Sequence, residues 1–430
     1  MRRTLAFPVN YATLYTSPMP TLSHKIRLTP TLEQRVAMAK ACGCARFAWN
    51  WALARYKQLK EQGVAKVSIN ELKKEFNQIK EEQFPWIYES PKDANQRPFA
   101  NLKKALNSYY QTEAKGGKKG YPKFKKKGRY DSFYISNDKF KIENQLVRLP
   151  VIGLVKMTEP LRFEGKILSG TVSRTANDWF LSVQIQLPET YSRSNLKENP
   201  IIGIDLGIKT FAVTSDHTEF QAPKPLKMYL KRLKRLSRRH SNKIKGSHNR
   251  EKSAVRLAKL HQRISNIRQD FIHKLTTKLV QENQVLVMET LNVKGMVKNR
   301  RLSRAISDAG FGEFLRQIEY KAILHNRAII KADRWFPSSK TCNACGSVKT
   351  KLDLSERDYI CESCGVIEDR DYNAALNLRD YGLSVLNNKL PEAIGDVKPV
   401  ETQALASDLS GVKLESMKQE FSGGLRLTRK

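Results

Sequence analysis

The chain has 430 residues, enough for two or three domains that each bury a core of their own. Its 77 lysines and arginines exceed 42 aspartates and glutamates, so the formal net charge is +35. This excess indicates a polyanionic partner, because self-repulsion would otherwise destabilise a compact domain. No apolar stretch approaches the roughly 20 residues of a membrane span, and prolines interrupt the uncharged N-terminal stretch, which argues against a signal peptide.

The N-terminal half begins with a strand pattern and continues with helices. Lys25–Thr31 alternates charged and apolar side chains, as a half-exposed strand does. Thr31 is suited to cap a helix that starts at Leu32, and further helices are predicted over residues 70–83 and 93–114. The aromatic side chains of residues 45–56 are predicted to pack between helices, with base stacking as the alternative.

A basic loop is predicted after the Gly116-Gly117 break. Its lysines can neutralise phosphates while its aromatic side chains pack on bases or sugars, and a solvated loop is the alternative. The residues predicted to contact nucleic acid are Lys118, Lys119, Tyr121, Lys123, Phe124, Lys125, Lys126, Lys127 and Arg129.

Residues 132–187 show short alternating patterns that predict a small antiparallel barrel or sheet. Lys25–Thr31 is a candidate for its first strand, which would make the intervening helices an insertion. Two long basic helices follow residue 225, and their apolar stripes predict a helical hairpin with a positive outer face.

Asp205 stands at the end of the apolar run Ile201–Ile204 and just before Gly207, a pattern that predicts a buried strand and a tight turn. A charge at this position is costly unless it is compensated, commonly by a cation, although capping of the turn is the alternative. Glu289 ends a second buried strand, Val285–Met288, in the same way.

A third acid, Asp371, lies where a helix begins. The three acids can converge if the two strands are neighbours, as in a ribonuclease-H-like sheet, and converged carboxylates repel one another unless they bind divalent metal. We therefore predict that Asp205, Glu289 and Asp371 are catalytic and hold two Mg²⁺ ions for phosphodiester cleavage. Asp369 is equally suited to cap the helix. Asn373 and Asn377 are predicted to orient the helix or a metal-bound water.

The six cysteines divide into two kinds. Cys42 and Cys44 are two residues apart on a predicted helix, so they point to different faces and are expected to be buried small residues. The other four form two C-x-x-C pairs, each followed by glycine, which is typical of a structural zinc ribbon without an open coordination position. Its ligands are Cys342, Cys345, Cys361 and Cys364.

Together these motifs resemble the TnpB family, the OrfB-type proteins of bacterial insertion sequences, which are related to type V CRISPR effector nucleases. The matching segments are Gly203–Gly207, Met288-Glu289, Ser338–Cys342 with the four cysteines, and Asp369–Asn377. The resemblance implies an RNA-guided DNA endonuclease that binds a guide RNA and a target DNA beside a short motif. It also implies a bacterial cytoplasmic protein that acts at the nucleoid.

The resemblance implies an α/β multidomain organisation: a wedge-like β-barrel (23–31 and 118–190), a helical recognition lobe (32–117), a RuvC-like nuclease domain (191–389) and, inside it, the zinc ribbon (338–368). Residues 1–22 fall outside the resemblance and are predicted to be an N-terminal extension. The composition of residues 390–430 predicts a disordered tail.

Three other functions are compatible with parts of the sequence. Asp205–Thr210 is similar to an ATP-phosphate loop of the actin and sugar-kinase fold, but the basic charge and the zinc ribbon argue against that fold. The chain could instead be a nucleic-acid-binding regulator or transposition accessory protein that cuts nothing, or a strand-transferring transposase. Some TnpB-like proteins have lost an acid, whereas all three acids are present here.

Overall fold

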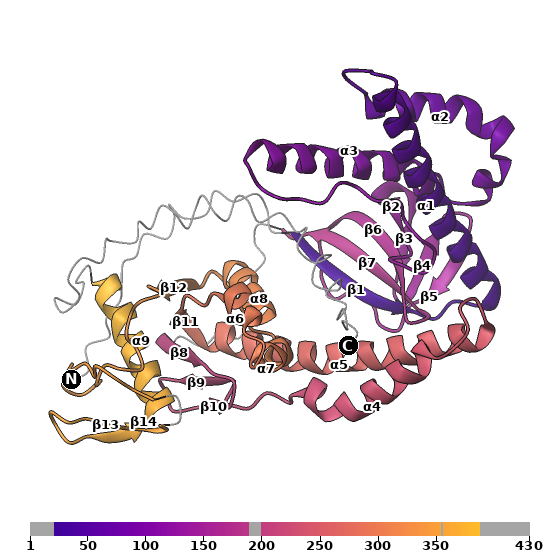
Figure 1. Ribbon diagram of the computed structural model, residues 1–430. Coiled ribbons are helices and arrows are strands. Elements are labelled where there is room, and N and C mark those ends of the chain that lie inside the picture. The colour runs from indigo at the N-terminus through magenta and orange to yellow at the C-terminus, as the bar shows by residue number, and fades with distance from the viewer. Residues whose placement is uncertain (1–20, 189–198, 354–355, 388–430) are drawn as a thin grey trace. The chain divides into compact units, whose positions relative to one another are not determined.

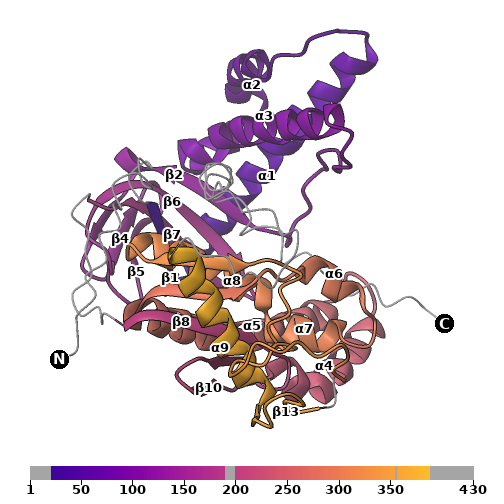
Figure 2. The ribbon, with the colours of Figure 1, turned by 90° about the vertical axis from the view of Figure 1, so that its left-hand side faces the viewer.

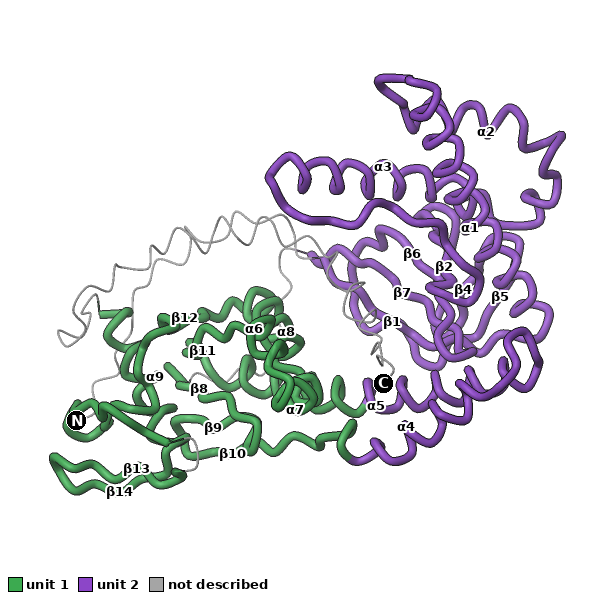
Figure 3. Tube along the Cα trace, in the orientation of Figure 1, with its two compact units in different colours: residues 1–18, 193–227, 267–430 green, residues 19–192, 228–266 purple. Residues whose placement is uncertain are grey.

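The computed structural model describes residues 21–188, 199–353 and 356–387, which fall into two compact units (Figures 1 and 3). Unit 1 takes residues 1–18, 193–227 and 267–430, and unit 2 takes residues 19–192 and 228–266. The predicted N-terminal extension lies largely, and the predicted tail entirely, outside the described residues. Within these residues, no helix has the length and hydropathy of a membrane span.

The N-terminal helices of unit 2 agree with the prediction, except for the short 3-10 helix at Pro85–Glu89, which was not predicted. They are α1 (Leu32–Glu61), α2 (Ile69–Gln83), the 3-10 helix η2 (Pro85–Glu89) and α3 (Lys92–Ala114). Thr31 caps α1 in a capping box with Gln34. The predicted helical core is confirmed, because the buried ring of Phe76 lies 5.0 Å from that of Trp51 and 5.2 Å from that of Phe99.

Cys42 and Cys44 are both buried on α1, as predicted. Burial raises the pKa of each thiol to about 12, so neither is poised to act as a thiolate ligand near neutral pH.

Unit 2 also contains two antiparallel sheets. The first has the order β1-β7-β6-β2, and the second the order β3-β4-β5. The strands are β1 (Thr21–Leu28), β2 (Ser132–Ser136), β3 (Lys141–Glu143), β4 (Leu146–Leu149), β5 (Gly153–Lys156), β6 (Lys166–Thr175) and β7 (Asp178–Gln186). The predicted antiparallel sheet is present, whereas β5 and β6 were not predicted. Closure of these strands into a barrel stays a prediction.

The first strand is shifted from its predicted bounds, Lys25–Thr31. It begins at Thr21 and ends at Leu28, where a single bridge to Met157 joins it to the second sheet. Thr29 donates its N–H to the carbonyl of Lys156 at 2.8 Å, and Pro30 has no N–H to continue a ladder. The chain therefore leaves the sheet before Thr31, which is free to cap α1.

Unit 1 is built on a five-stranded mixed sheet in the order β10-β9-β8-β11-β12. Strands β8, β9 and β10 are antiparallel neighbours, and β11 runs parallel to both β8 and β12. The strands are β8 (Asn199–Leu206), β9 (Ala212–Thr214), β10 (Glu219–Phe220), β11 (Asn283–Glu289) and β12 (Ala328–Ala332). The sequence predicted β8, β9 and β11 but not the two edge strands.

The helices after β10 are α4 (Pro225–Ser241), α5 (His248–Glu282), α6 (Val293–Lys298), α7 (Ser303–Ala309), α8 (Phe311–Leu324) and α9 (Arg370–Leu386). The first two are the predicted basic helices. Residues 228–266, which hold most of α4 and about half of α5, group with unit 2 instead of unit 1.

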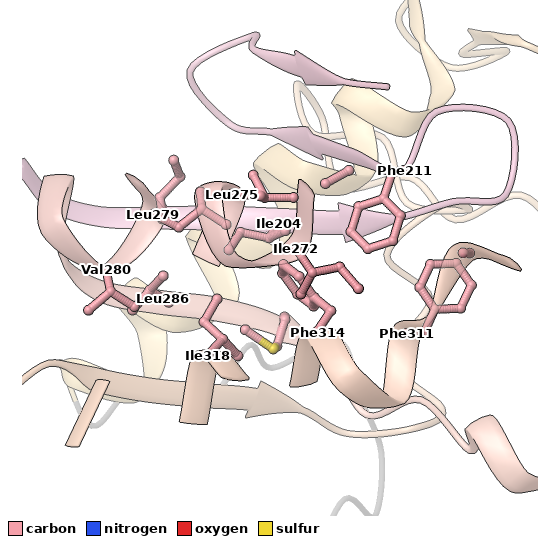
Figure 4. Packing of buried hydrophobic residues seen from close by; sticks show 14 of the residues in the cluster. Ile204, Phe211, Ile272, Leu275, Leu279, Val280, Leu286, Phe311, Phe314 and Ile318 are labelled. Carbon is pink, nitrogen blue, oxygen red and sulfur yellow. The ribbon is translucent and has the colours of Figure 1, made fainter. Parts of the chain in front are cut away.

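The two faces of the five-stranded sheet are buried under different helices. On one face, Ile204 and Leu286 pack with residues of α5 and α8 such as Ile272 and Phe314 (Figure 4). On the other face, Val285 and Val287 pack with Leu378 and Tyr381 of α9, which lies against β8 (Figure 2). Successive side chains of β8 and β11 therefore point alternately to the two helical layers.

Candidate active site and metal centre

Strand alternation puts two of the predicted acids on one face of the sheet. Ile204 is paired with Met288 in the parallel register of β8 and β11, and both side chains lie in the core with α5 and α8. The next residues on the two strands are Asp205 and Glu289. Because successive side chains point to opposite faces, both acids project from the face covered by α9.

Helix α9 brings the third acid to this face. Asp371 lies in its first turn, and Asp369 caps the helix by accepting the N–H groups of Asp371 and Tyr372 at 2.9 Å each. Capping is thus the role that the structure gives Asp369. A Cβ on Gly203 would lie 2.0 Å from the carbonyl oxygen of Ala375, one turn beyond Asp371. The main chain of α9 therefore rests directly on β8.

The electrostatics of Asp205 depend on the other two acids. Burial raises the pKa of Asp205 well above its usual value, and the negative charges of Glu289 and then Asp371 raise it further. Arg370 and the N–H of Leu206 lower it. The three carboxyl groups are thus close enough to repel one another, and a divalent cation would relieve that repulsion. In charge and chemistry the residues suit such a cation, but in this structure their carboxylate oxygens do not all lie within 4.8 Å of one another.

Glu289 and Asp371 each have protein partners that were not predicted. Ser338 donates its Oγ–H to Glu289. Arg370 donates to Asp371 from Nε at 3.1 Å and from Nη2 at 2.8 Å, and Nη1 of Arg357 lies 3.7 Å from the other oxygen. A cation at Asp371 would share this carboxylate with Arg370. The neighbouring positions of Arg370 and Asp371 were visible in the sequence, but the direction of the two side chains was not.

The four paired cysteines converge on one point. Their sulfurs all lie within 4.8 Å of one another, with 3.7 Å between Cys342 and Cys364 and 3.6 Å between Cys345 and Cys361. Tetrahedral zinc with bonds of about 2.3 Å separates its sulfurs by about 3.8 Å. The cysteines therefore fit a zinc ion. They are the one such group of possible ligands in the parts of the chain that the structure describes.

Glycines shape the two knuckles of this ribbon. Gly346 and Gly365 both have a φ of 75°, a left-handed conformation that favours glycine. Their N–H groups donate to the carbonyls of Cys342 and Cys361 at 2.9 Å. The short strands β13 (Asp358–Ile360) and β14 (Ile367–Asp369) support the second knuckle.

Asn373 and Asn377 hold the ribbon to α9. Both side chains donate to the carbonyl of Thr341 at 2.7 Å, and Asn377 also donates to the carbonyl of Ser338 at 2.7 Å. Asn373 accepts the N–H of Asn343 at 2.9 Å. The predicted role was to orient the helix or a metal-bound water, but these amides are bonded to the main chain around the first knuckle. The one-turn spacing indicated that the two side chains act together, but the sequence did not predict that they bond to the carbonyl of Thr341.

The predicted basic loop lies against α1. Asn50 fixes its main chain, since its side chain accepts the N–H of Lys125 at 2.7 Å and donates to the Lys125 carbonyl at 3.0 Å. Phe124 is 48% exposed, whereas Tyr121 packs edge-on against Tyr109 with ring centres 5.1 Å apart. Contact of this loop with nucleic acid stays a prediction.

A second basic surface, which we call the α4 basic face, was not among the predicted binding residues. Helix α4 contains no acid, and its exposed cations are Lys227, Lys231, Arg232, Lys234, Arg235, Arg238 and Arg239. None of these seven forms an ion pair with another described residue. In the sequence, the absence of acids from residues 225–241 was the feature that could have indicated this surface.

Three family models match the chain. Residues 182–300 match a model described as "Probable transposase", and residues 311–378 match "Cas12f1-like, TNB domain". Residues 19–63 match a model described as "Helix-turn-helix domain". In the structure that last region holds β1 and then α1, which is one uninterrupted helix of 30 residues.

Relatives match along most of the chain. A protein of Streptomyces pristinaespiralis named "Putative RNA-guided DNA endonuclease" is 34% identical over 405 residues, which cover 91% of this chain and 95% of the relative. The Escherichia coli (strain K12) protein "Putative RNA-guided DNA endonuclease InsQ" is 29% identical, with 84% and 92% covered.

A solved structure shares the fold. A chain of the "Cryo-EM structure of the Cas12f1-sgRNA-target DNA complex" matches with a TM-score of 0.50 and 15% identity, and the match covers 84% of this chain and 99% of that chain. The mixed sheet and the four-cysteine ribbon thus belong to a mixed α/β fold, and this chain shares that fold class with the Cas12f1 chain. Within that class, the chain belongs to the TnpB family, the OrfB-type proteins of insertion sequences.

Proposed function

We propose that this protein is an RNA-guided DNA endonuclease encoded by a transposable element. It binds a guide RNA, recognises a short motif beside its target, and hydrolyses DNA phosphodiester bonds. The observation that carries the proposal is the position of Asp205 and Glu289 at neighbouring strand ends on the face that α9 covers, with the pKa of Asp205 raised by burial and then by the charges of Glu289 and Asp371. The names of the full-length relatives support the RNA-guided activity.

The strand order supports a RuvC-like, ribonuclease-H-like nuclease domain over residues 191–389. Three antiparallel strands followed by two parallel ones, in the order β10-β9-β8-β11-β12, are typical of that fold. We further propose that residues 23–31 and 118–190 form a wedge-like barrel and residues 32–117 a recognition lobe. The position of α1, α2 and α3 between β1 and β2 supports this division. Such a protein acts in the bacterial cytoplasm, on nucleoid DNA.

Asp205, Glu289 and Asp371 would hold two Mg²⁺ ions, and the four cysteines one structural Zn²⁺. Held there, magnesium would supply the positive charge needed to activate the attacking water and to stabilise the leaving oxygen. The protein's own contribution is orientation: α9 and β8 set the positions of two carboxylates, and Ser338 holds the third. Arg370 supplies a positive charge beside Asp371.

One observation favours the alternative of a guided regulator or accessory protein that cuts nothing. Arg370 engages Asp371 through two nitrogens, which competes with a cation for that carboxylate. Both functions predict RNA binding, so cleavage is the measurement that separates them.

The test of the proposed function starts from protein purified from its native context. We expect a defined RNA to co-purify, and sequencing that RNA identifies the guide. With a matching duplex and Mg²⁺, we expect hydrolysed DNA ends without joined strands. Joined strands would indicate a strand-transferring transposase instead. Bound RNA with intact DNA over a range of adjacent sequences would favour the regulator.

Guide RNA binding should weaken steeply as salt rises, because lysines and arginines that contact phosphates release counterions. Each lost contact makes the negative slope of log K against log salt less steep by about 0.7 on a single strand and about 0.9 on a duplex. We therefore expect replacement of Lys231, Lys234 and Arg235 by glutamine to make this negative slope less steep by roughly 2 to 3. A second variant, with Lys123, Lys126 and Lys127 of the basic loop replaced by glutamine, gives a matched comparison. If either variant leaves the slope unchanged, the surface altered in that variant does not contact the RNA.

A further inference from the structure

The segment between β12 and the first zinc ligand, Cys342, connects the two candidate metal sites. Ser338, which is 2% exposed, donates its Oγ–H to Glu289. Its N–H donates to the carbonyl of Phe336 at 2.9 Å, and its carbonyl accepts from Asn377 at 2.7 Å. The main chain on both sides of this hydroxyl is therefore fixed. The Ser338 hydroxyl cannot turn far from Glu289 without the loss of buried hydrogen bonds.

Helix α9, which carries Asn377, also holds the first zinc knuckle. Asn373 and Asn377 both donate to the carbonyl of Thr341, the residue before the zinc ligand Cys342. Asn343, the residue after Cys342, donates its side-chain amide to Asn377 at 3.2 Å. Thus Asn377 bonds on one side to the residue that holds Glu289 and on the other to residues that flank a zinc ligand. Both amides are buried, with 2% of Asn373 and 6% of Asn377 exposed.

We propose that Ser338 is a positioning residue that orients the Glu289 carboxylate for a divalent cation, and that the zinc ribbon fixes Ser338 through Asn377. The inference rests on the proposed function, which supplies the cation. A glutamate side chain has several freely rotating bonds, and here it faces two like charges. Without a donor, Glu289 is expected to turn away from Asp205. Groups that hold a metal ligand in place typically change metal affinity by about 10- to 100-fold.

The test is a calorimetric titration of the full-length, zinc-loaded protein with Mn²⁺. We expect Ser338→Ala to weaken Mn²⁺ binding by about 10- to 100-fold while the zinc content stays at that of the wild type. Ser338→Thr keeps a hydroxyl and should restore most of the affinity. Ser384→Ala, which removes a hydroxyl from α9 that bonds to Tyr381, is the matched control and should change nothing. Wild-type affinity in Ser338→Ala, or no recovery in Ser338→Thr, would overturn the positioning role.

Asp205→Asn separates this inference from the proposed function. If Asp205→Asn loses Mn²⁺ binding and Ser338→Ala does not, the positioning role is wrong and the proposed site stands. If Asp205→Asn binds Mn²⁺ as well as the wild type does, the proposed site is wrong and the inference fails with it.

A double-mutant cycle tests the link to the ribbon. Asn377→Ala should weaken Mn²⁺ binding in the wild type but add little to Ser338→Ala, because both changes act on Glu289 through one hydroxyl. Independent, additive losses would overturn the link through Asn377. Zinc content is measured in each variant, so that loss of the ribbon itself is recognised.

Discussion

Replacement of Asp205 with asparagine is expected to abolish DNA cleavage and, at the same time, to stabilise the metal-free protein. The removal of one oriented group that stabilises transition-state charge typically costs about 100- to 1,000-fold, and the loss of a direct ligand should cost at least as much. RNA binding should be retained, because Asp205 lies on the sheet under α9 and is not part of the basic loop that is predicted to contact nucleic acid. Cleavage by the wild type and the variant at equal guide occupancy is the measurement.

The stability effect follows from the sign of the pKa shift. The pKa of Asp205 is raised on folding, so its protonated form favours the folded state. That contribution is fully present below the pKa of the unfolded chain, about 3.9, and is lost as pH rises through the folded value. At neutral pH, above the pKa of the unfolded chain, the raised pKa of folded Asp205 therefore lowers the free energy of unfolding. We expect Asp205→Asn to melt at least about 2 °C higher without divalent ions.

Two outcomes would contradict this assignment. Cleavage by folded Asp205→Asn at the wild-type rate would remove Asp205 from the catalytic residues. A lower melting temperature at neutral pH would mean that the carboxylate is stabilising, and hence that repulsion from Glu289 and Asp371 is not felt there. Addition of Mg²⁺ should raise the melting temperature of the wild type more than that of the variant.

Replacement of Cys361 with serine is expected to remove zinc and to unfold the ribbon. Structural zinc in small domains contributes an apparent 10–16 kcal/mol or so of binding free energy at pH 7, far more than the few apolar contacts of this segment. The buried cluster around the site consists of Cys342, Tyr359 and Cys361 with Val366, so little core remains without the metal. Metal analysis and hydrogen exchange over residues 340–369 are the measurements.

Ser363→Ala provides the matched control, because Ser363 lies in the same knuckle and bonds through its hydroxyl to Ser347 without a role as a ligand. It should keep one zinc ion and normal exchange. A Cys361→Ser protein with wild-type zinc content would rule out the four-cysteine site. If exchange rises only within the ribbon, the five-stranded sheet is stable without it. If it also rises in α9, the amides of Asn373 and Asn377 carry the disturbance further.

Local patterns in the sequence predicted the parts of the site but not how they are held. The apolar runs that end at Asp205 and Glu289 and the spacing of the cysteines are local signals, and each corresponds to an element of the structure. The bond from Ser338 to Glu289 joins residues 49 positions apart. Such a contact depends on the pairing of β11 with β12, and β12 has too weak a pattern to be predicted.

The edge strands and the basic helices show the same limit. β10 has two residues and β12 has no fully buried side chain before Ala332, so neither shows a clear alternation. The hairpin of α4 and α5 was predicted from its apolar stripes, but its division between two compact units was not. Periodicity identifies which face of a helix is apolar; it does not identify the surface that covers it.

The contact at Gly203 has a consequence for how this site can change over time. At Gly203, α9 meets β8 through main-chain atoms, so no side chain sets the distance between the helix and the strand at that point. Exchange of residues on the opposite face, such as Phe211 and Phe314, is expected to cost stability. A single methyl group at Gly203 would instead act as a spacer and separate the two acids. The separation of Asp205 and Asp371 is thus expected to be more sensitive to a substitution at Gly203 than to changes in the core on the opposite face.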